Sequence, residues 1–119
     1  MVEIVNILLA LFSIGLGAIG WLMPRYTMKH LDLAPTDSTM GLSEIRAASG
    51  ALFIGLGVGA ILINSPHAFV MVGFAWGGAA IGRVTSIFAD GKASRQKITF
   101  FAIETVVASL LLVLNVPLI

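Results

Sequence analysis

Cysteine is absent from this 119-residue chain, which excludes disulfides, thiolate metal sites and cysteine nucleophiles. Charge is scarce as well, at 11% of the residues, and the net charge is only +1. With no long run of Lys and Arg, this balance gives no electrostatic basis for binding nucleic acid or for a polybasic lipid anchor. The sequence also contains no Ser/His/Asp arrangement and no phosphate-binding loop. We therefore expect a protein that is not an enzyme and that has no nucleic-acid partner.

The sequence offers no metal or cofactor site either. The histidines His30 and His67 fall in different loops, which the topology derived below places on opposite membrane faces, so they cannot share a metal ion. The segment from Gly15 to Gly20 matches a dinucleotide-binding glycine pattern, but it lies inside an apolar stretch with no strand before it. We therefore expect neither a metal nor a cofactor.

Apolar residues dominate what remains. They make up 58% of the chain, above the roughly 45–50% of soluble globular proteins, and the mean hydropathy is +1.02. Four stretches have the length of about 20 residues that a helix needs to cross hydrocarbon, and they cover residues 4–23, 44–63, 68–89 and 98–116. Unbroken runs of this length exclude the alternating strands of membrane barrels. The sequence predicts an all-α integral membrane four-helix bundle, with residues 1–119 as a single domain.

Turn-forming residues mark the predicted helix ends. Pro24 ends the first helix, and Ser43 is a candidate N-cap for the second. The other breaks are short turns, at residues 64–66, 90–91 and 115–117. The only long connection is the polar loop 24–43, whose first part, Arg25 to Leu31, is compatible with a short interfacial helix.

The loops predict an orientation. The first and third loops contain five basic residues, whereas the second loop and the termini contain none; the five are Arg25, Lys29, Lys92, Arg95 and Lys97. Basic loops stay on the cytoplasmic side, so both termini are predicted to face away from the cytoplasm. The first stretch lacks a basic leader and a small-residue cleavage site, so we interpret it as a retained helix. We expect a multi-pass protein of the inner (plasma) membrane.

Four charges in or beside the apolar stretches are the candidate site residues: Glu44, Arg46, Arg83 and Glu104. A charge within hydrocarbon costs about 3 kcal/mol even on lenient scales, so each needs a partner, a water-filled cavity or a function. Arg83 and Glu104 each lie about 10 Å inside the end of their helix, at matching depth on adjacent antiparallel helices. Glu44 and Arg46 begin the second helix at the same membrane face, so a network of all four is geometrically possible.

Three interpretations of these charges remain open. An arginine has five donors in a planar fork and can hold two carboxylates, which favours an ionic network that orients the helices. The same groups can instead form a site for a ligand, ion or proton. As a third interpretation, they are unlinked charges at the interface, where Arg83 reaches the headgroups and Glu44 lies in a first helical turn that favours an anion.

Glycine spacing is the second pattern. Small residues four apart let helix backbones approach closely in lipid, and three pairs of glycines have this spacing, Gly55/Gly59, Gly73/Gly77 and Gly78/Gly82. We predict helix contacts at these positions. The fourth helix has no glycine and is predicted to face lipid more broadly.

The segment Glu44-Ile45-Arg46-Ala47-Ala48-Ser49-Gly50 resembles the Glu-x-Arg-x-x-(aromatic)-Gly-Gly opening of the second helix in the DUF4345 family of small four-helix bacterial membrane proteins. Gly82-Arg83, Asp90-Gly91 and Glu104 resemble the rest of that pattern, so the similarity covers nearly the whole chain. The chain departs from the pattern at Ser49 and Ala51, where an aromatic residue and a second glycine are expected. The resemblance implies the fold and the location of the charges, and it implies no reaction.

Two functional hypotheses follow. The first is a structural or interaction protein, an oligomer or accessory subunit of a membrane assembly, whose Glu/Arg network orients its helices. The alternative is a protein that binds or transports a lipid, a quinone-like molecule or a small anion through the same charges. Membrane lipids and further copies or subunits are the expected partners.

Overall fold

A computed structural model describes residues 1–119 and contains helices and no strands. The long helices are α1 (Val2–Leu22), α4 (Leu52–Ile63), α5 (Pro66–Ala89) and α6 (Arg95–Asn115). The short elements are α2 (Pro24–His30), α3 (Met40–Arg46), the π-helical turn η1 (Ala47–Ala51) and the 3-10 turn η2 (Val116–Leu118). The all-α fold class is confirmed.

Four helical segments are long and apolar enough to cross a membrane: Val2–Leu22, Met40–Ile63, Pro66–Ala89 and Arg95–Leu118. The second of them is continuous through α3, η1 and α4. Large apolar side chains such as Leu62 and Phe88 are mostly exposed along these segments, as a hydrocarbon environment permits.

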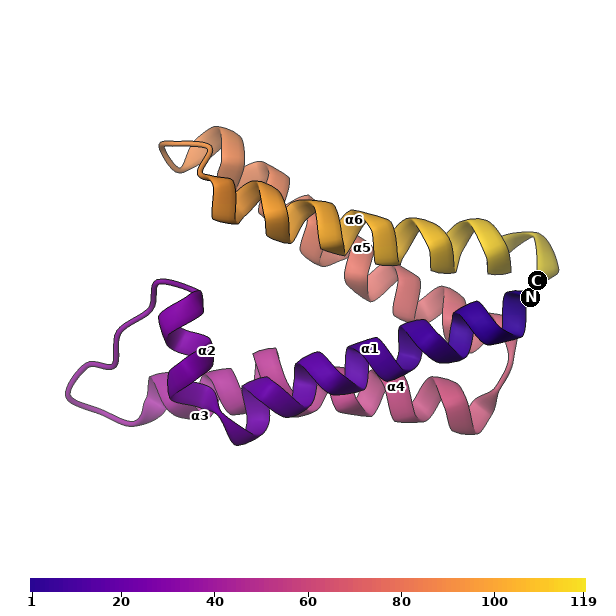
Figure 1. The fold of residues 1–119 in the computed structure, drawn as a ribbon, viewed down its shortest axis with the longest axis horizontal. Coiled ribbons are helices and arrows are strands. Elements are labelled where there is room, and N and C mark those ends of the chain that lie inside the picture. The colour runs from indigo at the N-terminus through magenta and orange to yellow at the C-terminus, as the bar shows by residue number, and fades with distance from the viewer. The chain divides into compact units, whose positions relative to one another are not determined.

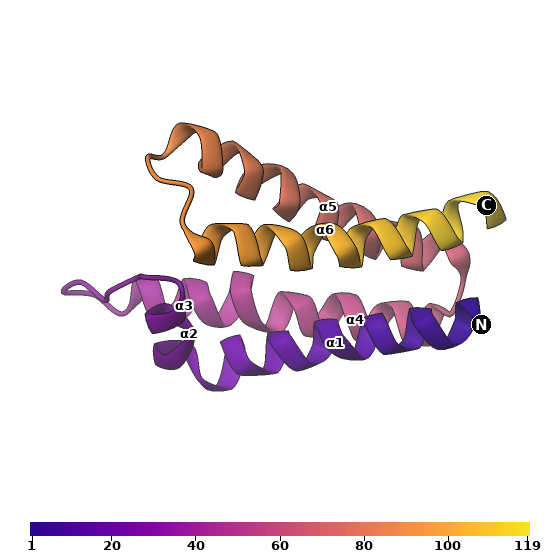
Figure 2. The same ribbon diagram turned by 45° about the horizontal axis from the view of Figure 1, so that its top comes forward.

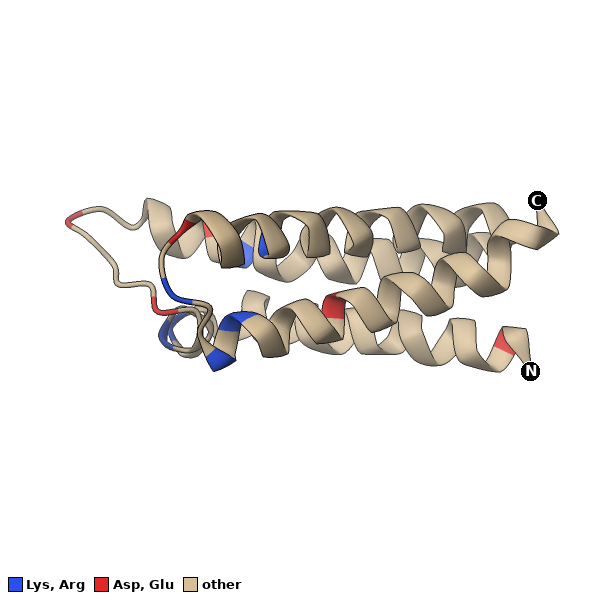
Figure 3. Cartoon of the chain, turned by 90° about the horizontal axis from the view of Figure 1, so that it is seen from above, with Lys and Arg blue, Asp and Glu red and all other residues tan.

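The chain divides into two compact units (Figures 1 and 2). The first, here called the α5·α6 unit, contains Met1–Asn6 and Ile63–Ile119, and the second, the α1·α4 unit, contains Ile7–Leu62. In each unit two long helices lie side by side. Lys and Arg occupy only the end of each unit that carries α2 and α3 or the 90–94 loop (Figure 3). The prediction of one domain for the whole chain stays a prediction.

The α1·α4 unit is an antiparallel pair joined through α2 and α3. Pro24 has no N–H and ends α1, and the chain then turns into α2, whose Met28 is buried against Gly41 of α3. The buried positions of α1 are almost all small, and they recur every three or four residues: Asn6, Ala10, Ser13, Gly17 and Gly20. The backbones therefore come close enough for the Ser13 hydroxyl to donate a hydrogen bond to the Phe53 carbonyl of α4, at 3.0 Å.

The α5·α6 unit is a hairpin with a cap at the start of each helix. The hydroxyls of Ser65 and Ser94 accept hydrogen bonds from backbone N–H groups three residues on, which satisfies one of the free donors in each first turn. Gly91 takes a positive φ of 78° in the connecting turn, a conformation that costs glycine little. The core between the two helices contains larger side chains, including Phe69, Trp76 and Leu111.

Two sequence expectations about the second helix are wrong. The helical segment begins at Met40 rather than Glu44, and Ser43 lies within α3 instead of capping it. The start is fixed upstream, where the Met40 N–H donates to the Ser38 hydroxyl at 3.3 Å. The short helix expected after Pro24 is present as α2.

Candidate functional site

The structure brings together two of the four candidate charges, Arg83 of α5 and Glu104 of α6. Arg83 Nε donates to Glu104 Oε1 at 2.8 Å, and the guanidinium carbon lies 5.2 Å from the centroid of the Phe100 ring, one helical turn before Glu104. The Glu104 side chain is 8% exposed and that of Arg83 34%. A buried carboxylate is thus neutralised by a cation whose outer face remains accessible.

This ion pair uses a single nitrogen of the arginine rather than a bidentate fork. Removing a carboxylate from water costs several kcal/mol unless a partner compensates, and the Glu104 side chain is only 8% exposed. The guanidinium of Arg83, from the neighbouring helix α5, is that partner. The pair therefore fixes the rotation of the two helices relative to each other.

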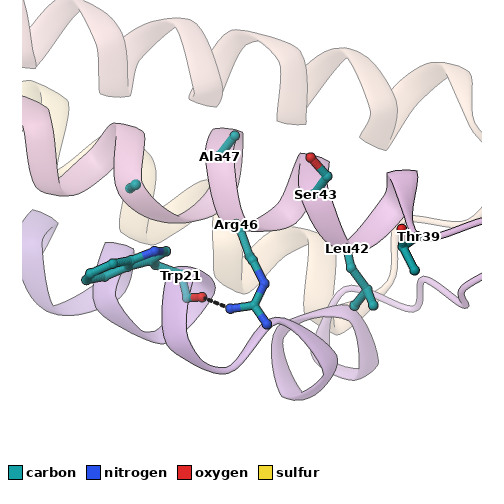
Figure 4. Close-up of a pocket in the computed structure, with 7 residues that line it drawn as sticks. Trp21, Thr39, Leu42, Ser43, Arg46 and Ala47 are labelled. Atoms are coloured by element: carbon teal, nitrogen blue, oxygen red, sulfur yellow. Dashed lines mark hydrogen bonds between the residues drawn. The ribbon is translucent and has the colours of Figure 1, made fainter.

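Arg46, at the end of α3, has a different kind of partner. Its Nη1 donates to the backbone carbonyl of Trp21 at 2.6 Å, in the last turn of α1 (Figure 4). The carbonyls of a last helical turn lack intrahelical partners, and a cation is favoured there by the helix dipole. Arg46 therefore caps α1 and remains exposed.

Glu44 forms no ion pair with Arg46 or with any other residue of the chain. It is exposed on α3, and residues two apart on a helix do not face each other. Glu44 and Arg46 belong to the α1·α4 unit, whereas Arg83 and Glu104 belong to the α5·α6 unit. The network of all four residues stays a prediction.

An open groove of about 530 Å³ lies beside Arg46 within the α1·α4 unit. Its lining comes from the end of α1 and one face of α3 and η1, and consists of Trp21, Thr39, Leu42, Ser43, Arg46, Ala47 and Ala51. The π-helical turn that supplies the last two residues is a kind of helix irregularity often found at functional sites. No group of three or more His, Asp or Glu side chains that could hold a metal is present.

Four glycines outside the three predicted pairs make the close helix contacts: Gly17, Gly20, Gly50 and Gly57. A Cβ on Gly17 would lie 2.6 Å from the Gly50 carbonyl oxygen, and one on Gly57 would lie 2.6 Å from that of Ala10. Gly20 meets the Ser49 carbonyl even more closely. The alternating spacing of three and four residues along Ala10, Ser13, Gly17 and Gly20 was the signal that could have found this contact.

The predicted glycine pairs behave differently. Gly73 is tightly packed, because a Cβ added to it would lie 3.0 Å from side-chain atoms of Leu112, and Gly77 is in ordinary contact with Ala108 at 3.7 Å. No atom lies within 4 Å of a Cβ added to the remaining four, Gly55, Gly59, Gly78 and Gly82. These four make no close contact within their own helix pairs, because their helices turn other faces to each other.

A second pair missed at the sequence level is Asn6 with Asn115. Each amide donates to the other's carbonyl oxygen at 2.8 Å, and Asn115 also donates to the Leu111 carbonyl. Both side chains are buried, so this reciprocal bond satisfies groups that would be costly to leave unpaired in an apolar setting. It ties the first turn of α1 to the end of α6.

Together these features define a class: a small all-α protein with four helices of membrane-spanning length, a buried glutamate paired with an arginine, and closely packed small residues. The family model described as "Domain of unknown function (DUF4345)" matches residues 1–115, and the chain belongs to this family. No curated protein and no solved structure matches the chain. Membership supports the fold and assigns no activity.

Proposed function

We propose that this protein is a multi-pass protein of the inner (plasma) membrane with a structural or interaction role, acting as an oligomer or as an accessory subunit of a membrane assembly. It is not an enzyme. The observation that carries this proposal is the Arg83–Glu104 pair, in which the buried carboxylate of α6 forms an ion pair with the guanidinium of α5. A carboxylate held in this way orients helices and is poorly placed to exchange protons or bind a substrate.

Exposed apolar surface supports an interaction role beyond lipid contact alone. A Cβ added to Gly55, Gly59, Gly78 or Gly82 would meet no atom of another helix within 4 Å, and small residues at helical spacing are the surfaces through which membrane helices associate. A second copy or another subunit would bring its backbone close at these positions.

Native mass spectrometry of the detergent-released protein tests the proposal. Glu104→Gln should lower the melting temperature of the protein or shift its subunit distribution. Glu3 is an exposed carboxylate at the start of α1, so Glu3→Gln should change neither. An unchanged melting temperature and an unchanged subunit number in Glu104→Gln would refute the role of the pair as a structural element.

The proposed orientation can be tested separately, because the chain contains no cysteine to remove. Single cysteines at His67 and Ala93 should react with an impermeant maleimide from opposite faces of right-side-out and inside-out vesicles. Ala93 lies in the basic loop and should react from the cytoplasmic face. Labelling of both positions from the same face would overturn the proposed topology.

Binding or transport of an anion or lipid is the second candidate function, and Arg46 is the observation that favours it. Its guanidinium is exposed, forms no ion pair and lies at a groove. Transport is tested by anion flux into liposomes that contain the wild type or Arg46→Ala. Equal fluxes in the two would remove the support for a transport pathway through this residue.

A further inference from the structure

The groove beside Arg46 combines one uncompensated positive charge with a hydroxyl group and an exposed aromatic ring. We propose that it binds the headgroup of an anionic phospholipid, with the phosphate at the Arg46 guanidinium. This inference rests on the membrane location proposed above and adds to it a specific ligand class and site.

The charge argument concerns the donors of Arg46. Only Nη1 has a protein partner, the Trp21 carbonyl, and no carboxylate lies within ion-pair distance. A guanidinium has five N–H donors in a planar fork that suits phosphate oxygens. Most of those donors remain for a ligand, in contrast to Arg83, whose charge is matched by Glu104.

The bond to Trp21 also orders the arginine. A long side chain normally loses rotamer freedom when it binds a ligand, and this loss lowers affinity. Because Nη1 is already held by the end of α1, part of that cost has been met by folding. The guanidinium extends from α3 toward Trp21, at the lower edge of the groove in Figure 4.

The walls of the groove match the rest of a headgroup. Thr39 and Ser43 line the groove, and the Thr39 hydroxyl can donate to glycerol or phosphate oxygens. The Ser43 hydroxyl points away from the Arg46 guanidinium, to the other side of α3 (Figure 4). Ala47 and Ala51 of the π-helical turn have small side chains and leave the groove open. Its volume of about 530 Å³ is within the range of roughly 300–1,000 Å³ that small-molecule sites occupy.

The surroundings favour a lipid over a free anion. Trp21 is 46% exposed and lies one residue before the end of α1, where tryptophan is enriched at the level of the headgroups. Leu22 and Met23 follow it and are also exposed, so apolar surface continues next to the charge. A free phosphate would use only the polar groups of the groove, whereas a phospholipid also covers this apolar surface with its acyl chains.

The test is a titration of delipidated, detergent-solubilised full-length protein with short-chain phosphatidylglycerol, monitored by native mass spectrometry. Phosphatidylcholine and inorganic phosphate serve as the two comparison ligands. We expect phosphatidylglycerol to bind more tightly than either. Arg46→Ala should weaken phosphatidylglycerol binding at least about tenfold, since it removes the charged hydrogen bonds to the phosphate.

Arg25→Ala is the matched control, because it removes the same charge from an exposed position that does not line the groove. It should weaken binding less than about fivefold, the most that a single exposed charge contributes. Arg46→Gln removes the charge but keeps a polar side chain at this exposed position, so it should fold as the wild type does and still lose the lipid. Arg46→Lys should recover part of the affinity.

Three results would overturn the proposal. They are an equal loss of phosphatidylglycerol affinity in Arg25→Ala and Arg46→Gln, binding of phosphatidylcholine as tight as that of phosphatidylglycerol, and binding of inorganic phosphate as tight as that of phosphatidylglycerol. Alkaline carbonate extraction of native membranes tests the membrane location separately from the headgroup site. Release of the protein by carbonate would refute the membrane location itself, whereas an embedded protein with no lipid preference would refute only the headgroup site.

Discussion

The two helix pairs of this protein are held together by different means. In the α1·α4 unit the backbones approach through Gly17, Gly20, Gly50 and Gly57, and the charged residue of the contact, Arg46, binds a main-chain carbonyl. In the α5·α6 unit large side chains fill the contact, and the charged residues bind each other. The first contact depends on the absence of side chains and the second on their presence.

This difference teaches where each pair can tolerate change. A backbone atom that meets a new methyl group cannot move without shifting the whole helix, whereas a leucine side chain can rotate away. The α1·α4 contact should therefore be sensitive to added atoms, and the α5·α6 contact to removed ones.

The largest effect is expected for Gly20→Ala. The new methyl group would collide with the Ser49 carbonyl and force α1 from η1, at a cost of about 3 kcal/mol in the free energy of unfolding. Gly15→Ala is the control on the same helix, since a methyl group there meets no atom within 4 Å. Unfolding in mixed SDS micelles measures both. Similar stabilities for the two variants would mean that the backbone contact is not what holds this pair.

Arg83→Ala should have the next largest effect. It leaves the carboxylate of Glu104 buried without a partner, and we expect a loss of about 2 kcal/mol, below the roughly 3–5 kcal/mol of fully buried pairs because Arg83 is partly exposed. Arg95→Ala, at an exposed arginine with no ion pair, is the control. Glu104→Gln should cost less than Arg83→Ala, since a freed arginine can extend toward the headgroups. The reverse order would contradict the assignment of Glu104 as the buried member.

A smaller loss of stability is expected when the Asn6–Asn115 pair is removed. This pair tests whether polar side chains stabilise the contact in addition to apolar ones. A double-mutant cycle with Asn6→Ala and Asn115→Ala should yield a coupling energy of about 1 kcal/mol, in the range of interhelical hydrogen bonds in membranes. If the effects of the two single substitutions are additive, the reciprocal hydrogen bond does not contribute to the free energy of unfolding.

The smallest effect is expected for Gly73→Ala, the counterpart of Gly20→Ala in the other pair. A methyl group there meets Leu112 side-chain atoms at 3.0 Å and the Leu111 Cβ at 3.1 Å, and a shift of a few tenths of an ångström relieves both contacts, so the cost should stay below about 1 kcal/mol. The same unfolding assay applies. A loss as large as that of Gly20→Ala would erase the distinction between the two helix pairs.

The helices and the Arg83–Glu104 pair could be predicted because both depend on features that are close together in the sequence. The length of the apolar runs follows from the membrane thickness, and two charges at equal depth on consecutive helices are brought together by the short connecting loop. Sequence reasoning misplaced the start of the second helix, which begins one turn before Glu44, at Met40. It also did not find the groove, whose residues come from α1 and from a helix start 18 positions further along the chain.

The amino-acid sequence by itself determined that the chain forms four apolar helices, where these helices end, and how far from the helix ends its few charges lie, because these properties depend on local composition and chain connectivity. Only the tertiary structure decided which face each helix turns toward its neighbour. The helices are apolar on all sides, so burial from water does not mark an inward face, and the choice between Gly20 and Gly15, or between a carboxylate and a carbonyl for Arg46, depends on the fit of two surfaces.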